Sequence, residues 1–195
     1  TLDLDEYMHK DHEAYNTLKS WMFNAKQWEE LIGIVRKNGK QLMLLLNDTR
    51  AVDFAIQFDP EMVEIHSVCL NVPRLQNSVL DIIDKKTKIV IGIGGCSLDE
   101  VNEAVNFFRS REVILMFGFQ NYPTKYEDVN LGKIRKIQAL YPEQKFGYAD
   151  HTAWDEDNNE LITLLVSSNG MDFIEKHVTT KYGEKRCDYS AAISI

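Results

Sequence analysis

The sequence predicts an α/β fold with parallel strands, on the strength of three observations. Short, continuous apolar runs alternate with segments in which apolar residues recur at helical spacing. The runs start 21 to 33 residues apart, which is the period of a strand followed by a helix. Turn residues bound each run, as expected of strands buried on both faces. The predicted strands are residues 41–46, 62–67, 88–93, 112–117, 145–148 and 171–175.

The helices are predicted from apolar periodicity and from residues that start or stop a helix. One helix is expected from Leu18 to Val35 and another, opened by a capping box, after Ser97. Two more are expected at residues 131–140 and around residues 161–165. No linker or composition shift interrupts residues 1–195, so a single domain is predicted. Six βα units suit either an open doubly wound sheet or most of an eight-unit barrel.

Composition and charge exclude several functions. The 195 residues carry 22 Lys and Arg against 30 Asp and Glu, a net charge of −8, so nucleic acid is not an expected partner. No apolar run approaches the ~18 residues that span a bilayer, and the acidic first residues are unlike a signal peptide. The three cysteines, Cys69, Cys96 and Cys187, have no metal-type spacing. These features predict a reduced, cytoplasmic protein without a membrane partner.

Functional residues are expected at the carboxyl ends of the strands, where α/β proteins gather them. His151 and His177 follow consecutive predicted strands at equivalent positions. Neighbouring strands lie ~4.8 Å apart, so the two imidazoles could hold one metal ion. The alternative is that each imidazole caps a strand end or bonds a loop carbonyl.

Three other features suggest sites less strongly. The glycine-rich turn at residues 92–95 precedes a helix, so it is either an anion cradle or a tight turn. His9 and His12 could mimic a metal pair, but a solvated helix face is the favoured interpretation. Glu64 and His66 are expected on one face of their strand, where an inward carboxylate needs a cation or hydrogen-bond donors.

Three sequence blocks, in order, resemble the sialic acid synthase family. They are NYPTKYEDVNL at residues 121–131, GYADHT at residues 147–152 and IEKHVT at residues 174–179. The resemblance extends over roughly residues 40–195. It implies a TIM-type (β/α) barrel, here of about six βα units, without the family's N-terminal strands and C-terminal antifreeze-like domain.

The resemblance also implies an activity. Family members condense phosphoenolpyruvate with an N-acetylhexosamine, typically N-acetylmannosamine, to give a nonulosonic acid. His151 and His177 match the histidines that hold a divalent ion, Mn²⁺ or Mg²⁺. Tyr122 and Asp188 match residues at the substrates and are the candidate catalytic residues, while Ser67 and Gln120 match further substrate contacts. A homodimer is expected by the same resemblance.

The chain departs from the family at three positions that bind phosphoenolpyruvate. Glu64 replaces a lysine, Gly92 replaces a serine and Ala149 replaces the serine of the second block. A charged anion needs cationic and hydroxyl donors, so these changes weaken anion binding. The alternatives are a degenerate, non-catalytic barrel that serves as a binding or scaffolding subunit, or a different metal-dependent lyase or hydrolase. Six strands of a barrel would also expose two sheet edges, which predicts dimerisation or a longer polypeptide.

Overall fold

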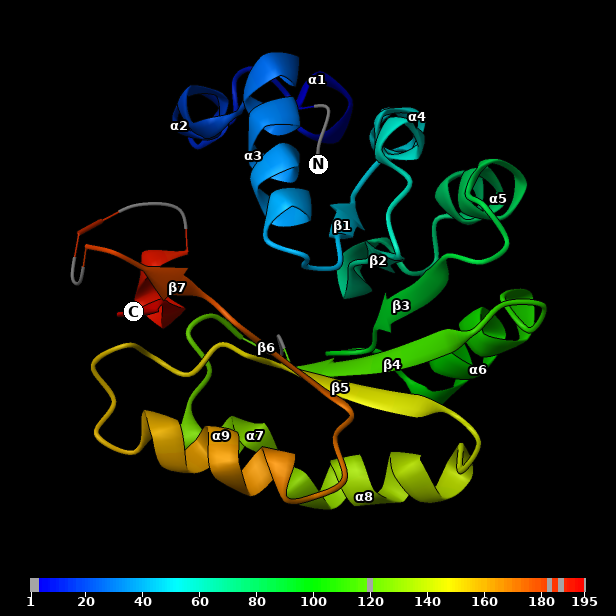
Figure 1. Cartoon of the computed structure of the whole chain (residues 1–195). Coiled ribbons are helices and arrows are strands. Elements are labelled where there is room, and N and C mark those ends of the chain that lie inside the picture. The colour runs from blue at the N-terminus through cyan, green and yellow to red at the C-terminus, as the bar shows by residue number, and fades with distance from the viewer. Residues whose placement is uncertain (1–3, 119–120, 182–183, 186–187, 195) are drawn as a thin grey trace. The chain divides into compact units, whose positions relative to one another are not determined.

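The computed structural model describes residues 4–118, 121–181, 184–185 and 188–194 (Figure 1). The chain divides into two compact units. Unit 1 comprises residues 1–90 and 102–112, and unit 2 comprises residues 91–101 and 113–195. The prediction of a single domain over residues 1–195 stays a prediction.

Strands and helices alternate along the chain, as the sequence predicts. The main sheet has the order β1-β2-β3-β4-β5-β6, so strands that follow one another in the sequence are hydrogen-bonded neighbours. Its strands are β1 (Met43–Leu46), β2 (Met62–Ile65), β3 (Lys88–Gly92), β4 (Val113–Gly118), β5 (Lys145–Asp150) and β6 (Phe173–Lys176). The α-helices are α1 (Leu4–Tyr7), α2 (Tyr15–Trp21), α3 (Ala25–Lys37), α4 (Thr49–Ala55), α5 (Pro73–Ile82), α6 (Leu98–Phe107), α7 (Tyr126–Val129), α8 (Leu131–Leu140) and α9 (Asn159–Ser167).

Short elements complete the chain. The 3₁₀ turns are η1 (Ile56–Phe58), η2 (Ser67–Cys69) and η3 (Tyr189–Ala191). A second, two-stranded parallel sheet pairs β7 (Val178–Thr179) with β8 (Ile193–Ser194). The amide of Ile193 donates to the carbonyl of His177 at 3.0 Å, which joins this small sheet to the residue that follows β6.

Unit 1 is built around the parallel pair β1–β2. Leu46 lies opposite Ile65 in the register, and both side chains are fully buried. Asp48 begins α4, because its carboxylate accepts a hydrogen bond from the Ala51 amide at 2.7 Å. Helix α4 then packs against α5. Burial of strand side chains on both faces explains the continuous apolar runs in the sequence.

Unit 2 is built around β4 and β5, which pair in parallel and bring Gly118 opposite Ala149. All six residues of β4 are buried. Helices α8 and α9 lie along β4 and β5 (Figure 1) and bury their inner stripes, which include Ile134, Ile162 and Val166. β6 pairs with β5 in parallel and completes this part of the sheet.

Three local expectations need correction. The single helix expected from Leu18 to Val35 is wrong, because Met22 is extended and Asn24 caps a new helix through a capping box with Gln27. His9 and His12 do not lie on a helix face; they are exposed in the turn between α1 and α2. β2 ends at Ile65, so His66 follows the strand and caps η2 instead.

None of the helices in the described residues combines the length and the apolar character needed to cross a bilayer.

Candidate metal centre

The register between β5 and β6 places the two predicted metal ligands side by side. Asp150 lies opposite Lys176, and Ala149 lies opposite Glu175. Side chains alternate along a strand, so Ala149 and His151 share one face of the sheet with Glu175 and His177. All of these residues belong to unit 2.

The two imidazoles face each other through their Nε2 atoms. His151 Nε2 and His177 Nε2 are 3.1 Å apart, and the ring centroids are 4.9 Å apart. The Nδ1 atom of His151 lies 3.1 Å from the carbonyl oxygen of Ala149. Because a carbonyl only accepts, Nδ1 carries the proton there and Nε2 presents its lone pair. A backbone carbonyl behind a metal-binding imidazole is the usual way to fix this tautomer.

Glu175 offers a third possible ligand atom, whereas the sequence assigns only the two histidines to the metal. One carboxylate oxygen of Glu175 and one ring nitrogen from each of His151 and His177 all lie within 4.8 Å of one another. Two imidazoles and a carboxylate form a donor set that suits a divalent transition metal. The residues therefore fit the kind of ion that the sequence predicts.

Electrostatics favour the neutral, ligating form of His151. Burial of the ring and the adjacent His177 both lower the pKa of His151, and these effects outweigh the opposing influence of the Ala149 carbonyl and the Asp188 carboxylate. Asp188, a predicted substrate residue, raises the pKa of this imidazole through its negative charge. Asp188 itself is exposed and has a left-handed backbone at the start of η3.

Tyr122 lies against the candidate metal centre, in the loop that follows β4. Its ring meets that of His151 edge-on, with centroids 5.8 Å apart. The same loop is tied to the strand, because the Thr124 amide donates to the His151 carbonyl at 2.8 Å and Thr124 forms a bridge with Thr152. Tyr122 is about one-third exposed, so its ring borders the site and still reaches solvent.

Asp150 and Lys176 point to the opposite face of the same two strands. Lys176 Nζ lies 2.7 Å from Asp150 Oδ2, and it also donates to Asn159 and Thr163 of α9. Burial raises the pKa of Asp150, but hydrogen bonds from Lys176, Thr163 and Thr152 outweigh it and hold that pKa below its ordinary value. The pair is therefore charged and firmly hydrogen-bonded.

The remaining predicted residues are not gathered with these histidines by any described contact. Ser67 begins η2, and Glu64 is buried on β2, both in unit 1. Gln120 lies outside the described residues. At the glycine-rich turn, Gly95 has a φ of 75° and the Cys96 amide donates to the Ile93 carbonyl at 3.3 Å, which is the geometry of a turn.

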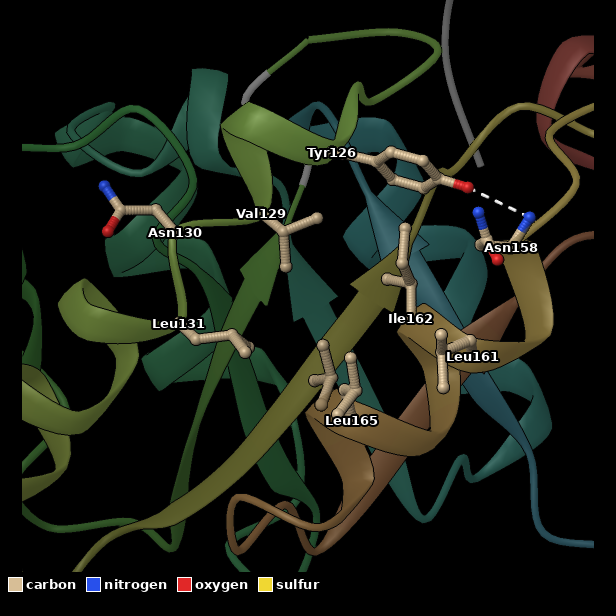
Figure 2. A pocket seen from close by; sticks show the side chains of 9 residues that line it. Tyr126, Val129, Asn130, Leu131, Asn158, Leu161, Ile162 and Leu165 are labelled. Atoms are coloured by element: carbon tan, nitrogen blue, oxygen red, sulfur yellow. Dashed lines mark hydrogen bonds between the residues drawn. The ribbon is translucent and has the colours of Figure 1, made fainter.

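Unit 2 also contains an apolar pocket of about 530 Å³ (Figure 2). Its walls come from α7, the start of α8 and α9, and include Val129, Leu131 and Leu165. At its rim, the Tyr126 hydroxyl accepts a hydrogen bond from the Asn158 amide at 2.9 Å. No charged side chain is among the residues that line this pocket, and Tyr126 is its one residue with a titratable side chain.

The fold and the site define a class of protein. It is an α/β protein with two converging histidines at the carboxyl ends of adjacent parallel strands. Within that class, the chain belongs to the NeuB family, whose profile matches residues 3–195. The resemblance to sialic acid synthases noted in the sequence is thereby confirmed.

Individual relatives agree with this family. The chain is 30% identical over 175 residues to N,N'-diacetyllegionaminic acid synthase of Legionella pneumophila, covering 85% of this chain and 46% of that protein. It is 24% identical over 174 residues to N-acetylneuraminate-9-phosphate synthase of Mus musculus, covering 88% of this chain and 46% of that protein. The chain thus spans about half the length of the curated relatives it matches.

Solved structures support the fold. The chain resembles N-acetylneuraminic acid synthetase of Leptospira borgpetersenii with a TM-score of 0.85 at 24% identity, over 97% of this chain and 64% of that chain. This likeness confirms the predicted fold class, a TIM-type (β/α) barrel represented by about six βα units.

Proposed function

We propose that this chain carries the metal-binding part of a synthase that condenses phosphoenolpyruvate with an N-acetylhexosamine, such as N-acetylmannosamine, to form a nonulosonic acid. Membership of the NeuB family and relatives named as legionaminic and neuraminate-phosphate synthases support this proposal. In the reaction, C3 of phosphoenolpyruvate bonds to the aldehyde carbon of the sugar. Water adds at C2, and phosphate leaves as the C–O bond breaks.

The convergence of two imidazole Nε2 atoms, 3.1 Å apart, is the observation that carries the proposal. His151 and His177 would hold Mn²⁺ or Mg²⁺, with the Glu175 carboxylate within reach. A divalent ion bound there supplies Lewis-acid polarisation of the sugar aldehyde. The Ala149 carbonyl keeps the proton of His151 on Nδ1, and burial lowers the pKa of the ring.

The other predicted site residues have proposed roles in binding. Tyr122 borders the histidines and would limit water at the aldehyde, while Asp188 would contact the sugar hydroxyls. Ser67 and Gln120 would contact the substrates, as their counterparts do in the family that the sequence resembles. The amino sugar and phosphoenolpyruvate are the only partners this role requires.

The buried carboxylate of Glu64 favours a second candidate, a metal-binding subunit that does not condense phosphoenolpyruvate. Glu64 is 7% exposed and stands where the resembled family has a lysine. At ~5 Å and an effective dielectric constant near 20, one unit charge contributes ~3 kcal/mol, so reversing the charge weakens anion binding by several kcal/mol. This candidate keeps the ion at His151 and His177 but loses the reaction.

Phosphate release tests the proposal directly. Adding phosphoenolpyruvate, N-acetylmannosamine and Mn²⁺ to the protein should release inorganic phosphate, and the substitution His151→Ala/His177→Ala should abolish both release and Mn²⁺ binding. The matched control, His9→Ala/His12→Ala, removes two exposed histidines and should change neither. Mn²⁺ binding that depends on the histidines, without phosphate release from any N-acetylhexosamine, would favour the second candidate. Unchanged Mn²⁺ affinity in His151→Ala/His177→Ala would refute both.

We also propose that the protein is a cytoplasmic homodimer. β1 and β6 stand at the two ends of the sheet order, and unpaired strand edges are templates for association. Sedimentation velocity should give a species of twice the chain mass of 22.5 kDa, and a stable monomer at micromolar concentration would contradict the dimer.

A further inference from the structure

A buried polar cluster lies directly behind the candidate metal centre, on the other face of the same two strands. Its central contact is the ion pair between Lys176 Nζ and Asp150 Oδ2, at 2.7 Å. The Asp150 side chain is fully buried and the Lys176 side chain is 12% exposed. A charged pair at this depth is unusual and requires complete hydrogen bonding to persist.

The hydrogen bonds of this cluster are complete around the ammonium group. Lys176 has three donors, and they have three acceptors in Asp150 Oδ2, Asn159 Oδ1 and Thr163 Oγ1. Thr163 in turn donates to Asp150 Oδ2, and the Thr152 amide donates to Asp150 Oδ1 at 3.0 Å. The cluster therefore joins β5, β6 and α9 through side chains of all three elements.

The cluster also holds the backbone that follows His151. The Asn159 amide group donates to the carbonyls of Thr152 at 3.0 Å and Ala153 at 2.8 Å. One side chain thus binds the segment after β5 and, through Lys176, the end of β6. Both histidines are one residue away from the ion pair along their strands.

A buried ion pair is a poor source of stability, since desolvation offsets most of the attraction, but it can specify register. In this sheet, register has a direct consequence for the site. A slip of β6 by one residue against β5 would turn His177 to the opposite face and separate the two Nε2 atoms. The pairing of Asp150 with Lys176 is satisfied only in the register that brings His151 and His177 together.

We propose that Asp150, Lys176, Asn159 and Thr163 are positioning residues, which set the spacing and orientation of the His151 and His177 imidazoles from behind the sheet. The inference rests on the proposed function insofar as the imidazoles are metal ligands. The position of the rings can also be measured without metal. A test can therefore separate the two ideas.

The experiment compares two matched double substitutions. Asp150→Asn/Lys176→Met neutralises the buried pair with side chains of similar size. Asp59→Asn/Lys86→Met makes the same changes in an ion pair of 3.0 Å in unit 1, where both side chains are about two-thirds exposed. Each protein is labelled at its histidines, of which the chain has five. Two quantities are recorded: the nuclear Overhauser effect between the imidazole protons of His151 and His177 without metal, and the affinity for Mn²⁺.

We expect Asp150→Asn/Lys176→Met to fold, as judged by circular dichroism, but to lose the contact between the rings. Its affinity for Mn²⁺ should fall ~10- to 100-fold, the usual effect of losing groups that orient metal ligands. The exposed-pair control should retain both properties. A folded buried-pair variant with the ring contact and the affinity of the wild type would overturn the proposal.

Thr163 provides an independent variant if the double substitution does not fold. Thr163→Val replaces the hydroxyl with a methyl group and should weaken Mn²⁺ binding several-fold, while Thr163→Ser keeps the hydroxyl and should retain the binding. Wild-type affinity and ring contact in Thr163→Val would overturn the proposal. The proposed function fails, while the positioning inference holds, if three results are found together. The wild type shows the ring contact, the buried-pair variant loses it, and the wild type does not bind Mn²⁺.

Discussion

His66 in unit 1 and His151 in unit 2 each follow a strand directly, yet their surroundings differ. The Nδ1 atom of His66 accepts a hydrogen bond from the Val68 amide at 3.3 Å and caps a 3₁₀ turn. The Nδ1 atom of His151 lies against the Ala149 carbonyl, and its Nε2 atom meets His177. Burial lowers the pKa of both rings. His66 therefore accepts a hydrogen bond through Nδ1, whereas in His151 the acceptor nitrogen is Nε2.

The difference arises from the neighbouring strand. His151 has a histidine at the equivalent position of β6, in a register fixed by the pairs before it. On β1, which pairs with β2, Asn47 follows Leu46 at the place equivalent to His66. Of these two histidines, the candidate metal ligand is the one that has a second imidazole at the same level on the adjacent strand.

The largest expected difference between His151 and His66 is in their effect on metal affinity. His151→Ala should lower the affinity for Mn²⁺ by ~100-fold or more, because even groups behind a ligand contribute ~10- to 100-fold. His66→Ala should leave that affinity unchanged, since its Nδ1 serves the cap of η2. Isothermal titration of both variants checks the contrast, and equal losses would show that His66 also serves the ion.

The Ala149 carbonyl, which lies against His151 and not against His66, allows a second test of the difference between these two histidines. A Cβ atom at Gly118 would lie 2.1 Å from the Ala149 oxygen, and the φ of Gly118 is 96°. Gly118→Ala should therefore lower the unfolding free energy by about 3 kcal/mol and weaken Mn²⁺ binding, because the carbonyl that orients His151 must move.

Gly147→Ala is the matched control for this substitution. Its Cβ would meet mainly the flexible end of Met116, at 2.7 Å from Sδ, so the loss of stability should be about 1 kcal/mol. Chemical denaturation of both variants measures the difference. Equal losses of unfolding free energy in Gly118→Ala and Gly147→Ala would mean that displacing the Ala149 carbonyl does not destabilise the protein.

The smallest expected effect concerns acid stability at His66. Burial lowers the pKa of His66 below its ordinary value of 6.5, so the unfolded chain binds the proton more readily. The stability associated with the neutral ring is complete above pH 6.5 and is lost as the pH falls towards the pKa of the folded state. One such proton gives a slope of at most about 1.4 kcal/mol per pH unit.

His66→Asn tests this slope, because its side-chain oxygen can still accept from the Val68 amide but does not titrate. Unfolding at pH 7.5 should be nearly unchanged, while the loss between pH 6.5 and pH 5.5 should become smaller. An unchanged slope would show that other groups, among them His151, carry the whole acid sensitivity.

The sequence predicts the strands well because burial on both faces leaves continuous apolar runs. All six predicted strands exist, with ends within about two residues of β1 to β6. The long helix fails because the apolar spacing continues through Met22 and Phe23, whereas Asn24 forms a cap that starts α3. Apolar periodicity detects the buried face of a helix. It does not detect an interruption of the helix that leaves the apolar spacing unchanged.

The equivalent positions of His151 and His177 after their strands predict that the two rings lie close together, and the structure confirms this proximity. Their assignment as metal ligands stays a prediction. Glu175 and Lys176 belong to the block at residues 174–179, but the roles of their side chains depend on which face of the sheet each occupies. That alternation becomes informative only when the register with β5 is known. The contacts of Asn159 and Thr163 depend on the packing of α9, for which the sequence gives no signal.

The loop that carries Tyr122 shares a backbone hydrogen bond with the residue that follows β5, from the Thr124 amide to the His151 carbonyl. Exchange of that single amide with deuterium would therefore follow the opening of the loop without altering any side chain of the site. Protection at Thr124 that rises when Mn²⁺ is added, while amides elsewhere in unit 2 keep their protection, would mean that ion binding and ordering of this loop are coupled.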